Sequence, residues 1–142
     1  MSTGFENERQ HIEEEFNSNW TSTACPIQFD NVNGLVSGTD IIKDVKGLDK
    51  WCRLTILNAI SNNVGLGGTM VRHMGDIVIN IFTKTGTGTD VARELADDVY
   101  DIFVNKSFDT IRCEAPYMNI EGEIDEWYQL TVTVPFIRDE AG

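Results

Sequence analysis

Residues 79–103 constrain the fold most, because a strand pattern, a glycine-rich turn and a helix pattern follow one another there. From Thr89 the apolar residues recur every three or four positions, which is the period of a helix that packs by one face. This pattern predicts a helix over residues 89–105. Asp90 and Glu94 suit its first turns, where the helix dipole favours negative charge. The apolar positions are Val91, Ala92, Leu95, Ala96, Val99, Ile102 and Phe103.

The turn before this helix, residues 86–88, raises the question of a phosphate site. A dinucleotide-binding fingerprint needs a third glycine where Val91 stands, and a P-loop needs a lysine and a Ser/Thr that do not follow here. Asp90 would also place a carboxylate at the N–H groups that an anion should occupy. We therefore interpret the turn as a corner in which the glycines take positive φ and Thr87 or Thr89 caps the helix.

A second amphipathic helix is predicted at the N-terminus, where Thr3 and Glu6 have the spacing of a capping box. Its charged face is interpreted as solvated surface rather than a catalytic carboxylate cluster, because nothing in the pattern desolvates these groups. The apolar stripe is Phe5, Ile12, Phe16 and Trp20, and the charged face is Glu8, Arg9, Glu13 and Glu14.

Several segments have strand patterns. Residues 51–59 alternate, with Trp51 and Arg53 exposed on the less apolar face. Residues 69–82 read as one bent strand or two, with Gly75 as a bulge or bend. Residues 110–120 and 127–137 predict a hairpin with a longer connection between them. The aromatic residues on these strands are typical of core or subunit-interface packing rather than of a stacking platform.

The order of elements predicts an α+β domain, with a mostly antiparallel sheet covered on one face by two main helices, the N-terminal one and residues 89–105. The strands that flank the second helix could instead lie parallel through a right-handed crossover. We expect a single domain over residues 1–142, a short edge strand after Pro26, a long loop at about 31–50 that could contain a short paired stretch, and a frayed C-terminus at 138–142.

The formal charge of −12, from 23 acidic and 11 basic residues, argues against a protein that grips nucleic acid by neutralising phosphates. The three cysteines lack a C-x-x-C pair and the two histidines have no ligand spacing, so we expect neither a disulfide framework, nor a metal, nor a cofactor. No apolar run approaches a membrane span, and the N-terminus does not read as a secretory signal. No nucleophile motif indicates an enzyme.

Three segments together resemble a family of small bacteriophage tail proteins that are similar to lambda-type tail terminators, also called tail completion proteins. They are "WCRLTILNA", "IVINIFTKTGTGTDVARELADDVYDIF" and "APYMNIEGEIDEWYQLTVTVPF". The resemblance covers about residues 5 to 137. Residues 31–50 depart from the short linker that the family would have there.

The resemblance implies a structural protein of the virion that caps the tail tube, stops its polymerisation and forms a six-membered ring that joins the tail to the head. Its partners would be further copies of itself, the major tail tube protein and a head-completion or neck protein. It would act at the head–tail junction after assembly in the host cytoplasm. An acidic lumen would let DNA pass without binding.

Two alternatives to tail termination stay open. They are a neck or head-completion adaptor and a nucleotide-binding enzyme. The expected contact regions are the loop before residue 51, the glycine-rich connection at 65–68 and exposed strand edges, which can extend a sheet between subunits. The candidate contact residues are Leu35, Ile41, Ile42, Lys43, Lys46, Lys50, Trp51, Arg53, Gly65, Gly67 and Gly68.

Overall fold

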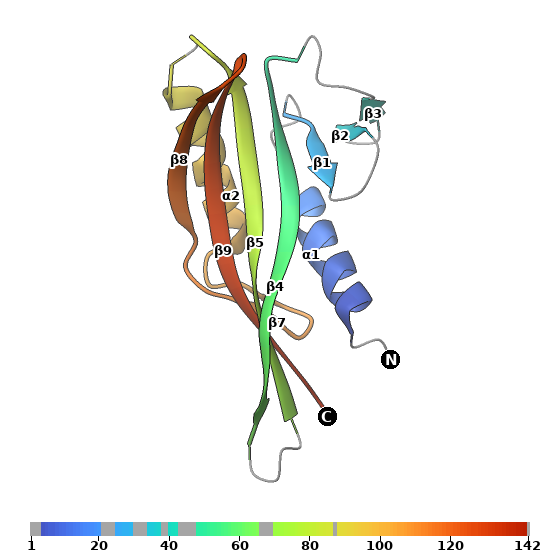
Figure 1. Ribbon diagram of the computed structural model, residues 1–142. Helices are drawn as coiled ribbons and strands as arrows, with labels where there is room; N and C mark the ends of the chain where they lie inside the picture. The colour runs from blue at the N-terminus through green and yellow to red at the C-terminus, as the bar shows by residue number, and fades with distance from the viewer. Residues whose placement is uncertain are drawn as a thin grey trace.

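Three strands of 15 residues form the centre of a curled sheet in the computed structural model (Figure 1). The structure describes residues 4–20, 25–29, 34–37, 40–42, 48–65, 70–86 and 88–141. In chain order the elements are α1 (Phe5–Asn19), β1 (Ile27–Phe29), β2 (Leu35–Ser37), β3 (Asp40–Ile42), β4 (Lys50–Val64), β5 (Met70–Lys84), α2 (Asp90–Phe103), β6 (Ser107–Phe108), β7 (Ile111–Cys113), β8 (Tyr117–Ile124) and β9 (Trp127–Ala141).

The described strands form one sheet in the order β3-β2-β1-β4-β5-β9-β7-β6, with β8 beside β9. Every pairing among them is antiparallel except that of β1 with β4. The mostly antiparallel α+β class is therefore confirmed. β5 before α2 and β7, which begins the segment predicted at 110–120, run in the same direction, but they are not paired because β9 lies between them.

β1 is not the edge strand that Pro26 suggested. It lies between β2 and β4, and its pairing with β4 places Ile27 opposite Cys52. Pro26 itself stays outside the strand, so its missing N–H interrupts no strand pairing. Its carbonyl accepts a hydrogen bond from the Cys52 N–H at 2.9 Å. The stretch predicted as a long loop contains the hairpin of β2 and β3, which is the short paired stretch allowed for there.

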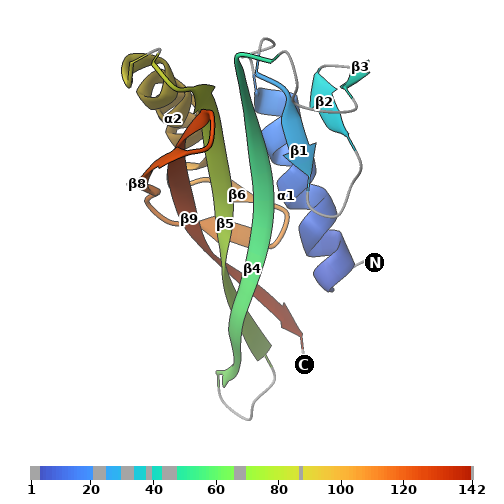
Figure 2. The ribbon, with the colours of Figure 1, turned by 45° about the horizontal axis from the view of Figure 1, so that its top comes forward.

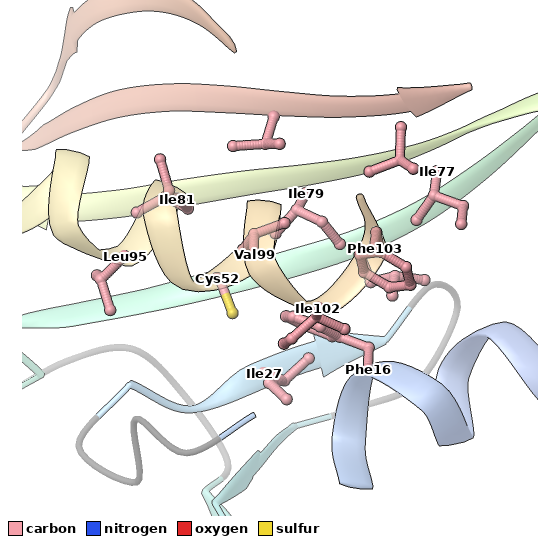
Figure 3. Close-up of a cluster of buried hydrophobic side chains, with 14 of the residues drawn as sticks. Phe16, Ile27, Cys52, Ile77, Ile79, Ile81, Leu95, Val99, Ile102 and Phe103 are labelled. Carbon is pink, nitrogen blue, oxygen red and sulfur yellow. The ribbon is translucent and has the colours of Figure 1, made fainter. Parts of the chain in front are cut away.

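The main core joins both helices to the sheet. Phe16 of α1 stacks on Phe103 of α2 with ring centroids 6.0 Å apart, and both belong to the buried cluster that contains Ile27 of β1 (Figure 3). Helix α2 packs on β5 and β9, while α1 lies beside β1 and β4 (Figures 1 and 2). The two helices thus share one buried cluster with the central strands. That they cover one whole face of the sheet stays a prediction.

The turn into α2 is the corner that the sequence predicts, because Gly86 and Gly88 have φ of +88° and +89°. The capping predictions fare less well. Thr89 stands at the N-cap of α2 without a side-chain hydrogen bond to the helix, and Thr87 lies outside the described residues. Gly4 stands at the N-cap of α1, while Thr3, and with it the predicted capping box, lies outside the described residues. Glu6 instead pairs with Arg9.

β5 is one continuous strand, and Gly75 explains how it fits its neighbours. A Cβ atom at this position would lie 2.7 Å from the Leu57 carbonyl oxygen and 2.8 Å from Cζ of Phe136. The register shift lies in β4, between Asn58 and Ser61, and not in β5. Gly75 is therefore required by close approach on both sides.

Two predictions about the C-terminal third are wrong. The hairpin of β8 and β9 turns through only two residues, Asp125 and Glu126, because "EGEI" belongs to β8. β9 also continues to Ala141, so residues 138–141 are not frayed. The reason for the second correction is Arg138, whose side chain is fully buried against α1.

Candidate assembly surface

A compact group of large side chains lies on the opposite face of the sheet from the main core. Since side chains alternate along β4, Cys52 and Leu54 enter the main core while Trp51 and Arg53 point to the other face. Trp51 stands directly opposite Phe82 of β5. We call this group the Trp51 cluster; it comprises Leu35, Leu48, Trp51, Phe82 and Trp127.

The Trp51 cluster is tightly packed. The rings of Trp51 and Phe82 stack with centroids 4.1 Å apart, and Trp127 meets Trp51 edge-on at 6.1 Å. Trp51 is only 8% exposed, so the prediction that it is exposed is wrong. Its indole Nε1 is buried without an acceptor among the described residues. The aromatic side chains of Trp51, Phe82 and Trp127 therefore bury one another, although no described helix packs on them.

Arg53 lies next to the Trp51 cluster and is half-buried. Its Nη2 donates to Oδ1 of Asn80 at 3.3 Å, and its guanidinium lies 5.4 Å from the Phe82 ring centroid. Asn80 in turn donates to Oγ1 of Thr131 at 2.9 Å. Polar side chains of β4, β5 and β9 are therefore linked across this face.

The other candidate contact residues are spread along the chain. Leu35 is in the Trp51 cluster, and Lys50 is half-buried opposite Thr83 at the start of β4. Ile41 and Ile42 belong to β3 and pair with β2. Gly65 follows the other end of β4 with φ of +84°. The structure thus brings together Leu35, Trp51 and Arg53, while Lys50 alternates onto the face of Cys52. Lys43, Lys46, Gly67 and Gly68 lie outside the described residues.

Two strand edges stand out that the sequence analysis did not name by residue. Within the described part of the chain, β8 pairs only with β9, and β1 covers β4 only at residues 52–54. Beyond that point β4 and β5 continue as an arm, residues 57–64 and 70–76, and the end of this arm extends past the helices (Figure 1). Leu57 and Ile60 on the arm are 54% and 59% exposed. The signal in the sequence was the run of residues 54–64, which contains no charge.

β8 also carries exposed apolar residues, beside the acidic Glu121 and Glu123. Tyr117, Ile120 and Ile124 are each about half exposed, at 51%, 50% and 53%. A pocket of about 130 Å³ lies between α2 and β8, lined in part by Tyr100, Tyr117 and Met118. β8 therefore offers a row of unpaired backbone groups beside a small hollow.

A polar network lies at the base of the arm and includes a hydroxyl, an imidazole and a carboxylate. Ser61 Oγ and His73 Nδ1 are 2.7 Å apart, and His73 Nε2 lies 2.5 Å from Oε1 of Glu140. These are the group types of a serine hydrolase triad. Here, however, the same Glu140 oxygen forms an ion pair with Arg138 at 3.3 Å, and the Phe5 ring lies edge-on to the imidazole at 5.2 Å. The arrangement links β4, β5 and β9 to α1.

Other chemistry finds little support in the described residues. They contain no group of three or more His, Cys, Asp or Glu side chains that could hold a metal ion. Burial raises the pKa of Cys113 to about 12 and that of Cys52 well above its usual value, so these thiols are poor nucleophiles. Neither described helix combines the length and the apolar content that a bilayer crossing requires.

Comparison with known proteins identifies the family. No curated protein matches the chain. Seven chains of solved structures do, and one of them covers 95% of this chain and 96% of its own length with a TM-score of 0.59. At 14% identity that likeness shows the fold alone. The sequence model of one family, described as phage tail terminator protein, matches residues 9–136, from α1 to β9. The chain therefore belongs to the phage tail terminator protein family.

Proposed function

We propose that this protein caps the phage tail tube, ends its polymerisation and forms a ring that joins the tail to the head. The family match over residues 9–136 carries this proposal. The role is structural rather than enzymatic. The partners are further copies of the chain, the major tail tube protein and a head-completion or neck protein, and the protein resides at the head–tail junction of the virion.

We propose a hexameric ring, in which one surface of each subunit meets a different surface of its neighbour. Both helices would cover one face of the sheet, which leaves the face with the Trp51 cluster for contacts. Arg53 at this face supplies positive charge in a chain of net charge −12. Lys50, which alternates onto the face of Cys52, is proposed as a contact at the start of β4. Seven further residues are proposed contacts because they lie in the segment before residue 51 or in the glycine-rich connection at 65–68. They are Ile41, Ile42, Lys43, Lys46, Gly65, Gly67 and Gly68.

The net charge of −12 supports a channel through which DNA slides. Carboxylates that face a lumen repel the phosphate backbone, so the binding of DNA there would be unfavourable. Sequence-specific DNA recognition is not part of this proposal.

The experiment that tests the function is tube capping in vitro. Purified protein is added to the tail tube protein of the same phage while tubes polymerise, and tube lengths are measured by electron microscopy. We expect shorter tubes with the protein bound at one end. Unchanged tube lengths, with the protein bound instead to the head-completion protein, would favour the neck adaptor. Heat released on titration with nucleotides would favour the enzyme.

A further inference from the structure

The free edges of β4 and β8 cannot pair with each other within one molecule. In the order of the sheet, β5 and β9 lie between β4 and β8, so the free edges of β4 and β8 face in opposite directions. They also occupy diagonal corners, since β1 covers one half of the β4 edge and β7 covers the opposite half of the β9 edge. Among the described residues no further strand is left to cover either edge, so a strand from another molecule can pair there.

The two edges carry only some of the devices that keep edge strands apart, which include lysine and other charged side chains, proline, β-bulges and short length. Residues 57–64 of β4 contain a register shift between Asn58 and Ser61 but no charged residue and no proline. β8 has Glu121, Glu123 and a register shift between Ile120 and Gly122, but no lysine, arginine or proline over eight residues. Leu57 and Ile60 on one edge and Tyr117 and Ile124 on the other remain half exposed. Edges of this kind pair with another strand when one is present.

Charge disfavours the pairing of two β8 edges. Two β8 strands laid side by side would bring Glu121 and Glu123 of both copies together, near two further acidic residues in each 125–126 turn. Like charges opposite each other destabilise strand pairs. The arm edge of β4 carries no charge, so it can approach β8 without this repulsion.

The pocket beside β8 offers a place for an apolar side chain of the incoming strand. It lies between α2 and β8 and has a volume of about 130 Å³, with Tyr100 and Tyr117 on its rim. For comparison, a cavity of about 150 Å³ takes up a benzene-sized guest.

We propose that the outer edge of the arm, residues 57–64 of β4, pairs with the outer edge of β8 in the next copy of this chain. This inference rests on the proposed function and deepens it, because it names the two surfaces that join subunits head to tail. The sheet then continues from one subunit to the next, and both free edges are covered by one repeated contact.

Cysteine cross-linking in assembled tails tests the pairing. One chain carries Asn62→Cys on the arm, and a second carries Asn119→Cys, Glu121→Cys or Glu123→Cys on β8; all four positions are exposed. Paired strands bring Cα atoms to about 4.5–5.5 Å, within disulfide reach. The native cysteines are buried and stay out of the reaction. We expect covalent dimers in at least one mixture of an arm variant with a β8 variant, and none from either variant alone.

Two results would overturn the pairing. The first is cross-linking of Asn62→Cys chains with each other, which indicates an arm-to-arm contact. The second is the absence of dimers from every mixture although the chains are present in tails of normal length; this leaves tail termination standing. If tail length does not depend on the protein at all, the proposed function fails instead, and that measurement needs no cysteine variant.

A charged variant provides a second readout. Ile60→Lys places a lysine on the arm edge, where it blocks strand pairing without entering the core. We expect incorporation into tails to fall at least tenfold while the free energy of unfolding of the monomer stays unchanged. The matched control is Asn17→Lys on the exposed face of α1, which adds the same charge away from both edges. Equal incorporation of the two variants would contradict the proposal.

Discussion

Arg138 of β9 donates from Nε to Oε1 of Glu8 in α1 at 2.9 Å, and both side chains are almost completely buried. Asn58 of β4 donates to the second Glu8 oxygen at 2.8 Å. The Phe5 ring lies 5.6 Å from the Arg138 guanidinium. This ion pair ties the first helix to the last strand and to the base of the arm, across 130 positions of sequence.

Removing one partner of this pair should be costly. Glu8→Gln removes the carboxylate that accepts from Arg138 Nε and leaves the buried Arg138 only its longer ion pair with Glu140. Breaking a buried pair in this way destabilises proteins by about 3–5 kcal/mol. The measurement is urea unfolding followed by circular dichroism. Glu6→Gln is the control, because Glu6 pairs with Arg9 at the exposed surface and should hardly change the midpoint. Equal midpoints for Glu8→Gln and the native chain would contradict the buried pair.

Gly75→Ala should destabilise the base of the arm. The added methyl group would meet the Leu57 carbonyl and the Phe136 ring at less than 3 Å, and overpacking of this kind costs about 1–3 kcal/mol. The control is Gly4→Ala, since a Cβ at Gly4 has no atom within 4 Å. Thermal unfolding distinguishes the two; a melting temperature for Gly75→Ala at or above that of Gly4→Ala would show that the strands can move apart freely.

The pair of Arg72 and Asp139 should make stability depend on pH. Arg72 donates from Nε and Nη2 to the two Asp139 oxygens at 2.9 and 3.1 Å, and this lowers the pKa of Asp139 in the folded state. A lowered pKa contributes stability that is present above the unfolded value of about 3.9 and is lost as the pH falls through the folded value. Arg72→Met should therefore lower stability at pH 7 and differ less from the native chain in acid.

Urea titrations at several pH values check this prediction. Arg93→Met serves as the control, because Arg93 is exposed on α2 and should show no such pH-dependent difference. A constant difference between Arg72→Met and the native chain from pH 7 down to pH 3 would mean that the ion pair does not contribute through the charge of Asp139.

Arg53→Glu should impair ring assembly more than monomer folding. If Arg53 contacts a neighbouring subunit, charge reversal at an interface arginine costs about 2 kcal/mol or more, roughly 30-fold in affinity. Incorporation into tails is measured beside the unfolding midpoint, with Arg93→Glu as the matched reversal on an exposed helix face. Normal incorporation of a folded Arg53→Glu chain would remove Arg53 from the proposed interface.

Local sequence patterns were enough to predict α2 and the glycine turn before it. The apolar residues of α2 follow the helix period, and Gly86 and Gly88 have the positive φ that glycine favours, so neighbours in sequence decide both features. Most antiparallel pairings follow from alternation and short turns in the same way. The Trp51 stack was harder to predict because its partners on β2, β5 and β9 meet only after the sheet is assembled.

Glu8 shows why part of the candidate site escaped prediction. Its position on a charged helical face indicates solvent, and only the distant Arg138 explains its burial. The parallel pairing of β1 with β4 likewise leaves no local signature. The uncharged residues 54–64 were visible in the sequence, but their exposure depends on where β1 stops covering β4.

The central claim is that this protein ends tail polymerisation, and tail length in its absence tests it most directly. Particles are produced by phage that lack the protein, and tails are measured by negative-stain electron microscopy beside particles that contain it. The account predicts overlong tails without heads, and normal lengths when the protein is restored. Tails of normal length that merely fail to join heads would contradict tail termination and indicate a neck adaptor.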